Sequence, residues 1–169
     1  MATTTGFSHI GMVARDPAAL AAFYRDALGM TITGGSDEGS QFGATAFLSS
    51  RPEEENHELA IFATPMYRHL AFKAASLADL RTLHRQVTAR GIPITLAFNH
   101  GCSLAFYFDD PEGNMVEVYW PTGLHNSQPY GDPLDLDASD ADLIDDVAGI
   151  AARAGLSLPP ALAAMGATP

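Results

Sequence analysis

The stretch "SHIGMVARDPAALAAFYRDALGM" (residues 8–30) has the same pattern as "RHLAFKAASLADLRTLHRQVTARGI" (residues 68–92). Adding sixty to a residue number in the first stretch places His9 on His69 and Asp16 on Ser76. Each stretch begins with a strand-like run and continues into an amphipathic helix, which Asp16 or Ser76 would cap at its N-terminus. This internal repeat indicates two copies of one structural unit.

The two helices share their local signals. Pro17 takes the first position of the first helix, where a missing backbone N–H costs nothing, and Gly29 and Gly91 are expected to end the two helices. Each helix should also carry an apolar stripe at helical spacing. The stripes consist of Leu20, Phe23 and Ala27 in the first helix and Leu80, Leu83 and Val87 in the second.

Short apolar runs separated by turn residues follow each helix. The expected strands are 8–14, 31–34, 44–48 and 58–63 in the first copy, and 69–75, 93–98, 103–108 and 115–120 in the second. Each copy therefore reads βαβββ, which predicts an α+β fold. A unit of about 60 residues is marginal alone, so the two copies should share one core. We place module one at 5–64 and module two at 65–122, within a domain of residues 1–125.

Composition and charge narrow the function classes. The chain has 169 residues, is 47% hydrophobic and carries a net charge of -11, which argues against nucleic acid and anionic membranes as partners. No apolar run approaches the roughly 20 residues that span a bilayer, and the N-terminus resembles no signal peptide, so we expect a cytoplasmic protein. The single cysteine, Cys102, excludes an internal disulfide and cysteine-based zinc sites, and should be a small buried group.

The repeat also relates polar residues that lie outside the two helical stretches. His9 and His57 are 48 residues apart, as are His69 and Glu117, so the shift of sixty places His57 on Glu117. The same shift places Phe47 on Tyr107. If a pseudo-twofold axis relates the modules, the three histidines and Glu117 could converge on one cavity.

Glu117 interrupts the apolar strand "NMVEVYW" (114–120), where a lone carboxylate would ordinarily face solvent. Histidines at repeat-equivalent positions favour another interpretation, in which His9, His69 and Glu117 bind a metal ion. Two imidazoles and one carboxylate leave coordination positions open, which suits ferrous iron. Zinc, manganese or nickel could use the same ligands.

Other candidates carry weaker signals. His100, in "NHGCS", could donate to the site or lie on the surface, His84 should be exposed on its helix, and His125 has no assigned role. The apolar residues that could line a pocket are Phe98, Phe106, Met66 and Met115.

With these residues in view, "NHGCSLAFYFDDPEGNMVEVYW" (99–120) and "HIGMVARDPAALAAFYRDALGM" (9–30) resemble the vicinal oxygen chelate superfamily. Over residues 5–122 the chain is most similar to the type I extradiol ring-cleaving dioxygenases. The resemblance implies two modules that form one incomplete barrel around a metal site. The family's residues map as follows: metal ligands onto His9, His69 and Glu117, the acid–base histidine onto His57, the active-site tyrosine onto Tyr107, and a pocket histidine onto His100.

The resemblance also implies a reaction. An aromatic diol of the catechol type and O2 would be the substrates, Fe(II) the cofactor with Mn(II) as the other possibility, and the ring would open beside the diol. The expected assembly is a homo-oligomer, a dimer or larger, of the one-domain form.

Two rival functions stay open on the sequence. A glyoxalase I-like isomerase or lyase would use Glu58 as an additional metal ligand, and because neighbouring residues on a strand point to opposite faces, only one of His57 and Glu58 can face the site. A drug-binding resistance protein of the bleomycin-binding type would need no metal ligands, and the acidic charge of the chain would favour a cationic drug.

The remaining residues, 126–169, form an acidic linker and a C-terminal helix with a tail. Ser139 should cap a helix over residues 140–154, which Gly155 ends. Its apolar stripe should pack on the main body or at a dimer interface, and consists of Leu143, Val147, Ile150 and Ala154.

Overall fold

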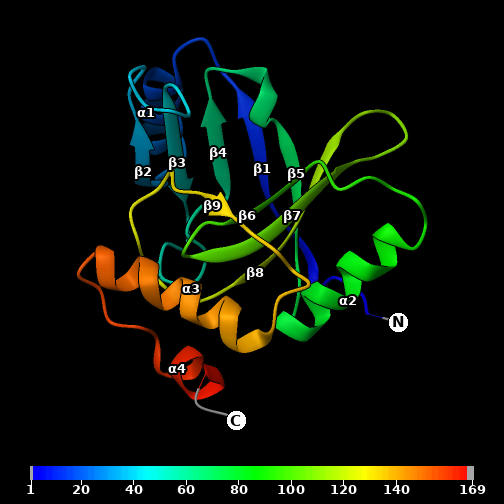
Figure 1. Cartoon of the computed structure of the whole chain (residues 1–169). Helices are drawn as coiled ribbons and strands as arrows, with labels where there is room; N and C mark the ends of the chain where they lie inside the picture. The colour runs from blue at the N-terminus through cyan, green and yellow to red at the C-terminus, as the bar shows by residue number, and fades with distance from the viewer. Residues whose placement is uncertain (1, 167–169) are drawn as a thin grey trace.

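A nine-stranded, curled mixed sheet forms the centre of the molecule (Figure 1), in a computed structural model that describes residues 2–166. The strands are β1 (Gly6–Val13), β2 (Thr31–Ser36), β3 (Thr45–Ser49), β4 (Leu59–Phe62), β5 (His69–Lys73), β6 (Leu96–Asn99), β7 (Ser103–Asp109), β8 (Met115–Pro121) and β9 (Asp132–Pro133). The helices are α1 (Pro17–Leu28), the 3-10 turn η1 (Pro65–Tyr67), α2 (Leu77–Thr88), α3 (Asp140–Arg153) and α4 (Pro160–Gly166). The predicted α+β fold of two βαβββ modules is confirmed.

The order of the strands shows how the modules are related. It runs β2-β3-β4-β1 in module one and β5-β8-β7-β6 in module two, so the two halves mirror each other about the junction between β1 and β5. At this junction the strands are antiparallel, with His9 opposite Ala71. Each central strand also pairs in parallel with the last strand of its own module, β4 or β8. The pseudo-twofold relation expected from the repeat therefore runs through the middle of the sheet.

The first helix has the predicted ends but not the predicted buried face. Asp16 accepts a hydrogen bond from the backbone of Ala19, and Gly29 adopts the left-handed conformation after the last turn. Of the stripe expected to pack, only Leu20 does so, because Phe23 is 60% exposed and Ala27 is also exposed, whereas Ala21 is buried. Apolar residues occur on two sides of this helix. The side that carries the small residue Ala21 is the one that packs on β3.

The second helix buries its predicted stripe, with Leu80 and Leu83 in the core. Its end differs from the prediction, because α2 stops at Thr88 and Gly91 lies in the turn that follows. Gly91 has φ 74°, so its role is to reverse the chain after the helix. This difference accounts for the spacing of 62, rather than 60, between the two glycines.

The C-terminal segment packs on module two. Ser139 and Asp142 form a capping box at the start of α3, which satisfies two backbone donors of the first turn. Leu143, Val147 and Ile150 are buried in one cluster with residues of β7 and β8, whereas Ala154 is exposed. In Figure 1 α3 crosses one end of the curled sheet, with α4 beneath it. No helix within residues 2–166 is long and apolar enough to cross a membrane.

Alternation along β7 and β8 separates the core from the concave face of the sheet. Phe106 and Val118 point toward the helices and are buried among α2 and α3. Tyr107 and Glu117, which pair across the two strands, point the other way. The expectation that Phe106 lines the pocket is therefore wrong, since its neighbour Tyr107 takes that face.

The packing of α3 predicts how mutations in the tail affect stability. Leu143→Ala removes a side chain that is 1% exposed and should lower the free energy of unfolding by about 2–4 kcal/mol. The same substitution at Leu28, which is 68% exposed, should change it by less than about 0.5 kcal/mol. Urea denaturation of both variants measures the difference. Equal losses would contradict the packing of α3 on the main body.

Candidate metal centre

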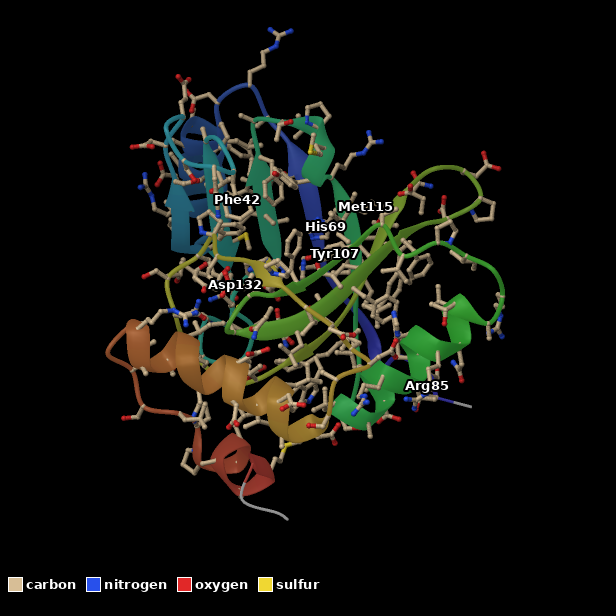
Figure 2. All side chains as sticks on the ribbon, viewed as in Figure 1. Phe42, His69, Arg85, Tyr107, Met115 and Asp132 are labelled. Atoms are coloured by element: carbon tan, nitrogen blue, oxygen red, sulfur yellow. The ribbon has the colours of Figure 1, made fainter. Side chains whose placement is uncertain are left out.

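Three buried ligand-type side chains meet on the three adjacent central strands of the sheet. His9 comes from β1, His69 is the first residue of β5, and Glu117 lies in the middle of β8. The Nε2 atoms of the two histidines are 3.0 Å apart, and each lies 3.1 Å from Oε2 of Glu117. Figure 2 shows His69 at the centre of the molecule, close to Tyr107. The sequence places these residues 60 and 48 positions apart, and the fold brings them together.

The triangle formed by these three atoms has the dimensions of a metal-binding face. Ligand atoms at ~2.1 Å from an ion and at right angles to one another are ~3.0 Å apart, whereas tetrahedral angles would place them ~3.4 Å apart. The observed separations of 3.0 and 3.1 Å bring the three donor atoms close enough to share one ion. Two imidazoles and one carboxylate on one ion would leave further coordination positions open.

The orientation of His69 suits a ligand. Its Nδ1 lies 2.7 Å from the carbonyl oxygen of Tyr67, so the ring donates there and, when neutral, carries a lone pair on Nε2. Gly11 makes this position possible, because a Cβ at residue 11 would lie 2.5 Å from Nδ1 of His69. Sequence analysis missed this residue. The signal was a glycine inside the strand "HIGMV", which often marks a close approach of another group.

The electrostatics of the cluster favour a charged carboxylate. Burial alone would raise the pKa of Glu117, but the charge of His9 and the hydrogen bonds from both imidazoles hold it well below its usual value. Burial opposes the charged form of His69, yet Glu117 outweighs this effect and raises the pKa of that histidine. Glu117 is 3% exposed, so its charge depends on positive charge nearby.

The register of the strands corrects one part of the repeat analysis. Glu117 pairs with Ala71 in module two, and in module one Ala60 pairs with Gly11 at the equivalent place. Phe47 pairs with Ala60 as Tyr107 pairs with Glu117, so the match of Phe47 to Tyr107 holds. The counterpart of Glu117 is therefore Ala60 and not His57. The connection from β3 to β4 is longer than that from β7 to β8, which shifts the numbering.

His57 nevertheless faces the cavity, from the loop that precedes β4. Its ring centroid is 4.4 Å from that of His9 and 5.0 Å from that of Phe47. Its Nδ1 lies 2.9 Å from Oδ1 of Asn56, so the ring donates to this oxygen and leaves Nε2 as an acceptor. Burial, together with the charge of His9, lowers the pKa of His57 well below its usual value, which keeps the imidazole neutral.

Glu58 points away from the three ligand-type residues. Its carboxylate accepts hydrogen bonds from the backbone of Ser50 and from the guanidinium of Arg51. The bond from Ser50 outweighs the effect of burial and, with Arg51, lowers the pKa of Glu58. His57 and Glu58, on the loop before β4, therefore take opposite directions, and the inward one is His57.

Tyr107 and His100 form a hydrogen-bonded pair at the side of the cavity. Nδ1 of His100 faces the carbonyl oxygen of Tyr130 and so carries the hydrogen, which leaves Nε2 to accept a bond from the Tyr107 hydroxyl at 2.9 Å. Burial and the charge of Glu117 raise the pKa of Tyr107 well above its usual value, so the phenol stays protonated. His100 thus lines the site, which was one of its two expected positions.

Residues after β8 hold this pair in place. The side-chain amides of Asn126 and Gln128 both donate to the backbone carbonyl of His100, at 3.0 and 2.8 Å. Oε1 of Gln128 accepts from the backbone of Tyr130, whose own carbonyl binds the His100 ring. Sequence analysis gave these residues no role, since they belong to a polar linker without periodicity.

A cavity of about 140 Å³ surrounds the cluster, a size comparable with the engineered cavity of about 150 Å³ that holds one benzene ring. Phe98 and Met115 line it as expected, but Met66 does not and is 67% exposed. Cys102 also lines it, and burial raises the pKa of this thiol to about 12. Figure 2 places Phe42 and Met115 on opposite sides of His69.

Of the two remaining histidines, one differs from expectation. His125, without an assigned role in the sequence, is an exposed residue of the cavity rim. His84 is half-buried rather than exposed, and its ring packs edge-on against Phe106 at 5.2 Å.

Comparison with known proteins gives relatives of several activities. Biphenyl-2,3-diol 1,2-dioxygenase 3 of Rhodococcus globerulus is 28% identical over 130 residues, which cover 70% of this chain and 64% of that protein. The crystal structure of a catechol 2,3-dioxygenase has 24% identity and a TM-score of 0.62 over 80% of this chain and 48% of that one. A Mn(II)-bound glyoxalase from Novosphingobium aromaticivorans has 21% identity and a TM-score of 0.58, over 80% and 44% of the two chains.

These matches establish the fold and the family rather than one activity. The chain spans 64% of the curated relative and less than half of each of the two solved chains. The family model of the Glyoxalase/Bleomycin resistance protein/Dioxygenase superfamily matches residues 6–118, which contain most of both modules and all three ligand-type residues. The chain therefore belongs to this superfamily.

Proposed function

We propose that the protein is an Fe(II)-dependent extradiol dioxygenase that cleaves the ring of a catechol-type diol with O2, with Mn(II) as the second metal that the ligands suit. The observation that carries this proposal is the set of three donor atoms on one face, with Ala60 at the place where a fourth ligand would stand. An ion held by only three side chains keeps positions for two diol oxygens and for dioxygen. The names of two of the three relatives, the biphenyl-2,3-diol and catechol dioxygenases, agree with this chemistry.

His9, His69 and Glu117 would hold the iron, which when bound would attract the catecholate and supply the redox chemistry of dioxygen. The remaining residues act on protons. A diol hydroxyl beside Tyr107 can pass its proton to the phenol oxygen while the phenol hydrogen moves to Nε2 of His100, because that nitrogen is already the acceptor. His57, neutral and with Nε2 free, can accept a proton and return it on the other side of the site.

The rival functions lack support of this kind. A glyoxalase-like site with an additional carboxylate ligand would need Glu58 to face inward, but it is hydrogen-bonded to Ser50 and Arg51. A drug-binding protein without a metal would have no use for a carboxylate buried to 3% exposure between two imidazoles. Metal binding separates these classes first.

Metal affinity tests the ligand set. His69→Ala and Glu117→Ala should each weaken Fe(II) or Mn(II) binding at least about 100-fold, since each removes one of three ligands. His125→Ala, which removes an exposed histidine of the cavity rim, should leave affinity within about twofold of the parent. Anaerobic calorimetric titration measures all three. Wild-type affinity in both ligand variants would refute the site.

Gly11 offers a test that leaves all three ligands in the chain. In Gly11→Ala the added Cβ would lie 2.5 Å from Nδ1 and 2.7 Å from Cε1 of His69, so the ring must move. Metal affinity should fall about 10–100-fold, as it does when the support of a ligand is lost. Gly39→Ala, in an exposed turn, is the control. An unchanged affinity in the folded Gly11 variant would mean that His69 is not held as described.

The two neighbours on the loop before β4 separate the reaction classes. His57→Ala should retain the metal and lower kcat for a catechol about 10²–10⁴-fold, because a proton-transfer group is lost. Glu58→Ala should keep kcat within about threefold, because its carboxylate binds only surface partners. The yellow ring-opened product, followed by absorbance, provides the assay. Loss of turnover in the Glu58 variant alone would overturn the proposed function.

A further inference from the structure

The charged residues around the cavity define which diols can enter it. The fixed charges among the residues that line it are the carboxylates of Glu54, Glu55 and Glu117. The chain has nine lysine and arginine residues, all within the described part, and none of them lines the cavity. Figure 2 shows one of them, Arg85, on α2 at the outside of the molecule, away from His69 and Tyr107. Away from the three ligand-type residues, a substituent in this cavity therefore meets carboxylates and no lysine or arginine.

The two cations that pair with glutamates of the cavity wall, Lys73 and Arg51, are not free for a ligand. Nζ of Lys73 lies 2.5 Å from a carboxylate oxygen of Glu55, whose other oxygen accepts from the Tyr119 hydroxyl. Arg51 binds both Glu54 and Glu58, and stays at the surface. Neither cation can turn to a ligand without leaving a carboxylate unpaired, and for Glu55, whose side chain is 13% exposed, that loss would be costly.

Several neutral donors around the cavity are committed as well. The amide of Gln128 binds the carbonyl of His100, and the ring of His100 is bonded at both nitrogens. The Tyr130 hydroxyl donates to Asp132. The rest of the wall has no lysine or arginine, and Phe47, Phe62 and Phe98 give it a large aromatic surface.

We infer that the diol accepted by this site carries uncharged, apolar ring substituents, and that the cavity discriminates against catechols with a carboxylate on the ring or side chain. The inference rests on the proposed function, because it assumes that the two diol oxygens bind at the metal. A side-chain carboxylate would then be placed in the cavity without a cation and beside Glu54 and Glu55, and would lose its hydration with little in return. An alkyl group in the same place gains the contact of the aromatic wall.

Two ligands of nearly equal shape test this discrimination. 3,4-Dihydroxyphenylacetamide and 3,4-dihydroxyphenylacetate differ in charge but not in size, and both keep the diol. Binding to the Fe(II)-loaded protein is measured by calorimetry without oxygen, so that no turnover occurs. The amide should bind at least about tenfold more tightly than the acid, since the acid alone carries an uncompensated charge.

A pair of matched variants locates the cause. Glu54→Lys brings a cation to the cavity wall and should reduce the preference for the amide at least about threefold. Glu53→Lys makes the same change in net charge at an exposed residue that does not line the cavity, and should leave the preference within about twofold. Thermal unfolding checks that both variants fold.

The outcomes of these experiments distinguish a failure of this inference from a failure of the proposed function. A tenfold preference that Glu54→Lys alone reduces supports the inference. Equal binding of the two ligands, or tighter binding of the acid, overturns it and leaves the proposed function standing. Equal effects of the two lysine variants also overturn it, because the local charge of the wall would then play no part. If neither diol binds the metal-loaded protein, the proposed function fails and the inference fails with it.

Discussion

Three polar atoms about 3 Å apart, in a place almost closed to water, are the constraint on which this structure depends. Glu117 is buried as an anion, so it needs positive charge from imidazolium groups or from a metal ion. The antiparallel junction of β1 with β5, and the parallel pairing of β5 with β8, fix the three backbones from which these side chains come. The two modules must therefore be joined in one register for the site to exist.

The chemistry of the cavity arises where the two modules differ. Glu117 and Tyr107 in module two correspond to Ala60 and Phe47 in module one, so one side of the pseudo-twofold axis is polar and the other apolar. This asymmetry leaves three ligand-type residues instead of four and makes part of the cavity wall aromatic. His57 comes from the longer loop of module one, and so has no counterpart at the equivalent strand position.

The segment after β8 contributes to the same cavity, although the family model ends at residue 118. Asn126 and Gln128 bind the backbone carbonyl of His100. The carbonyl of Tyr130 determines that Nδ1 of His100 carries the hydrogen. Arg153 of α3 in turn binds the Tyr130 hydroxyl and Asp132. The C-terminal helix is thus linked to the site through hydrogen bonds as well as through the core.

The sequence by itself determined the βαβββ repeat, the helix caps at Asp16 and Ser76, and the three ligand-type residues, because these follow from local periodicity and from a spacing that recurs. Only the tertiary structure decided which side of α1 is buried, that Ala60 and not His57 matches Glu117, and that Glu58 turns outward. It also showed that glycine at residue 11 leaves room for the ring of His69, and that residues 126–130 hold His100 in place. The physical reason is that strand register, loop length and the approach of distant side chains depend on contacts between segments, and no local pattern in the chain encodes those contacts.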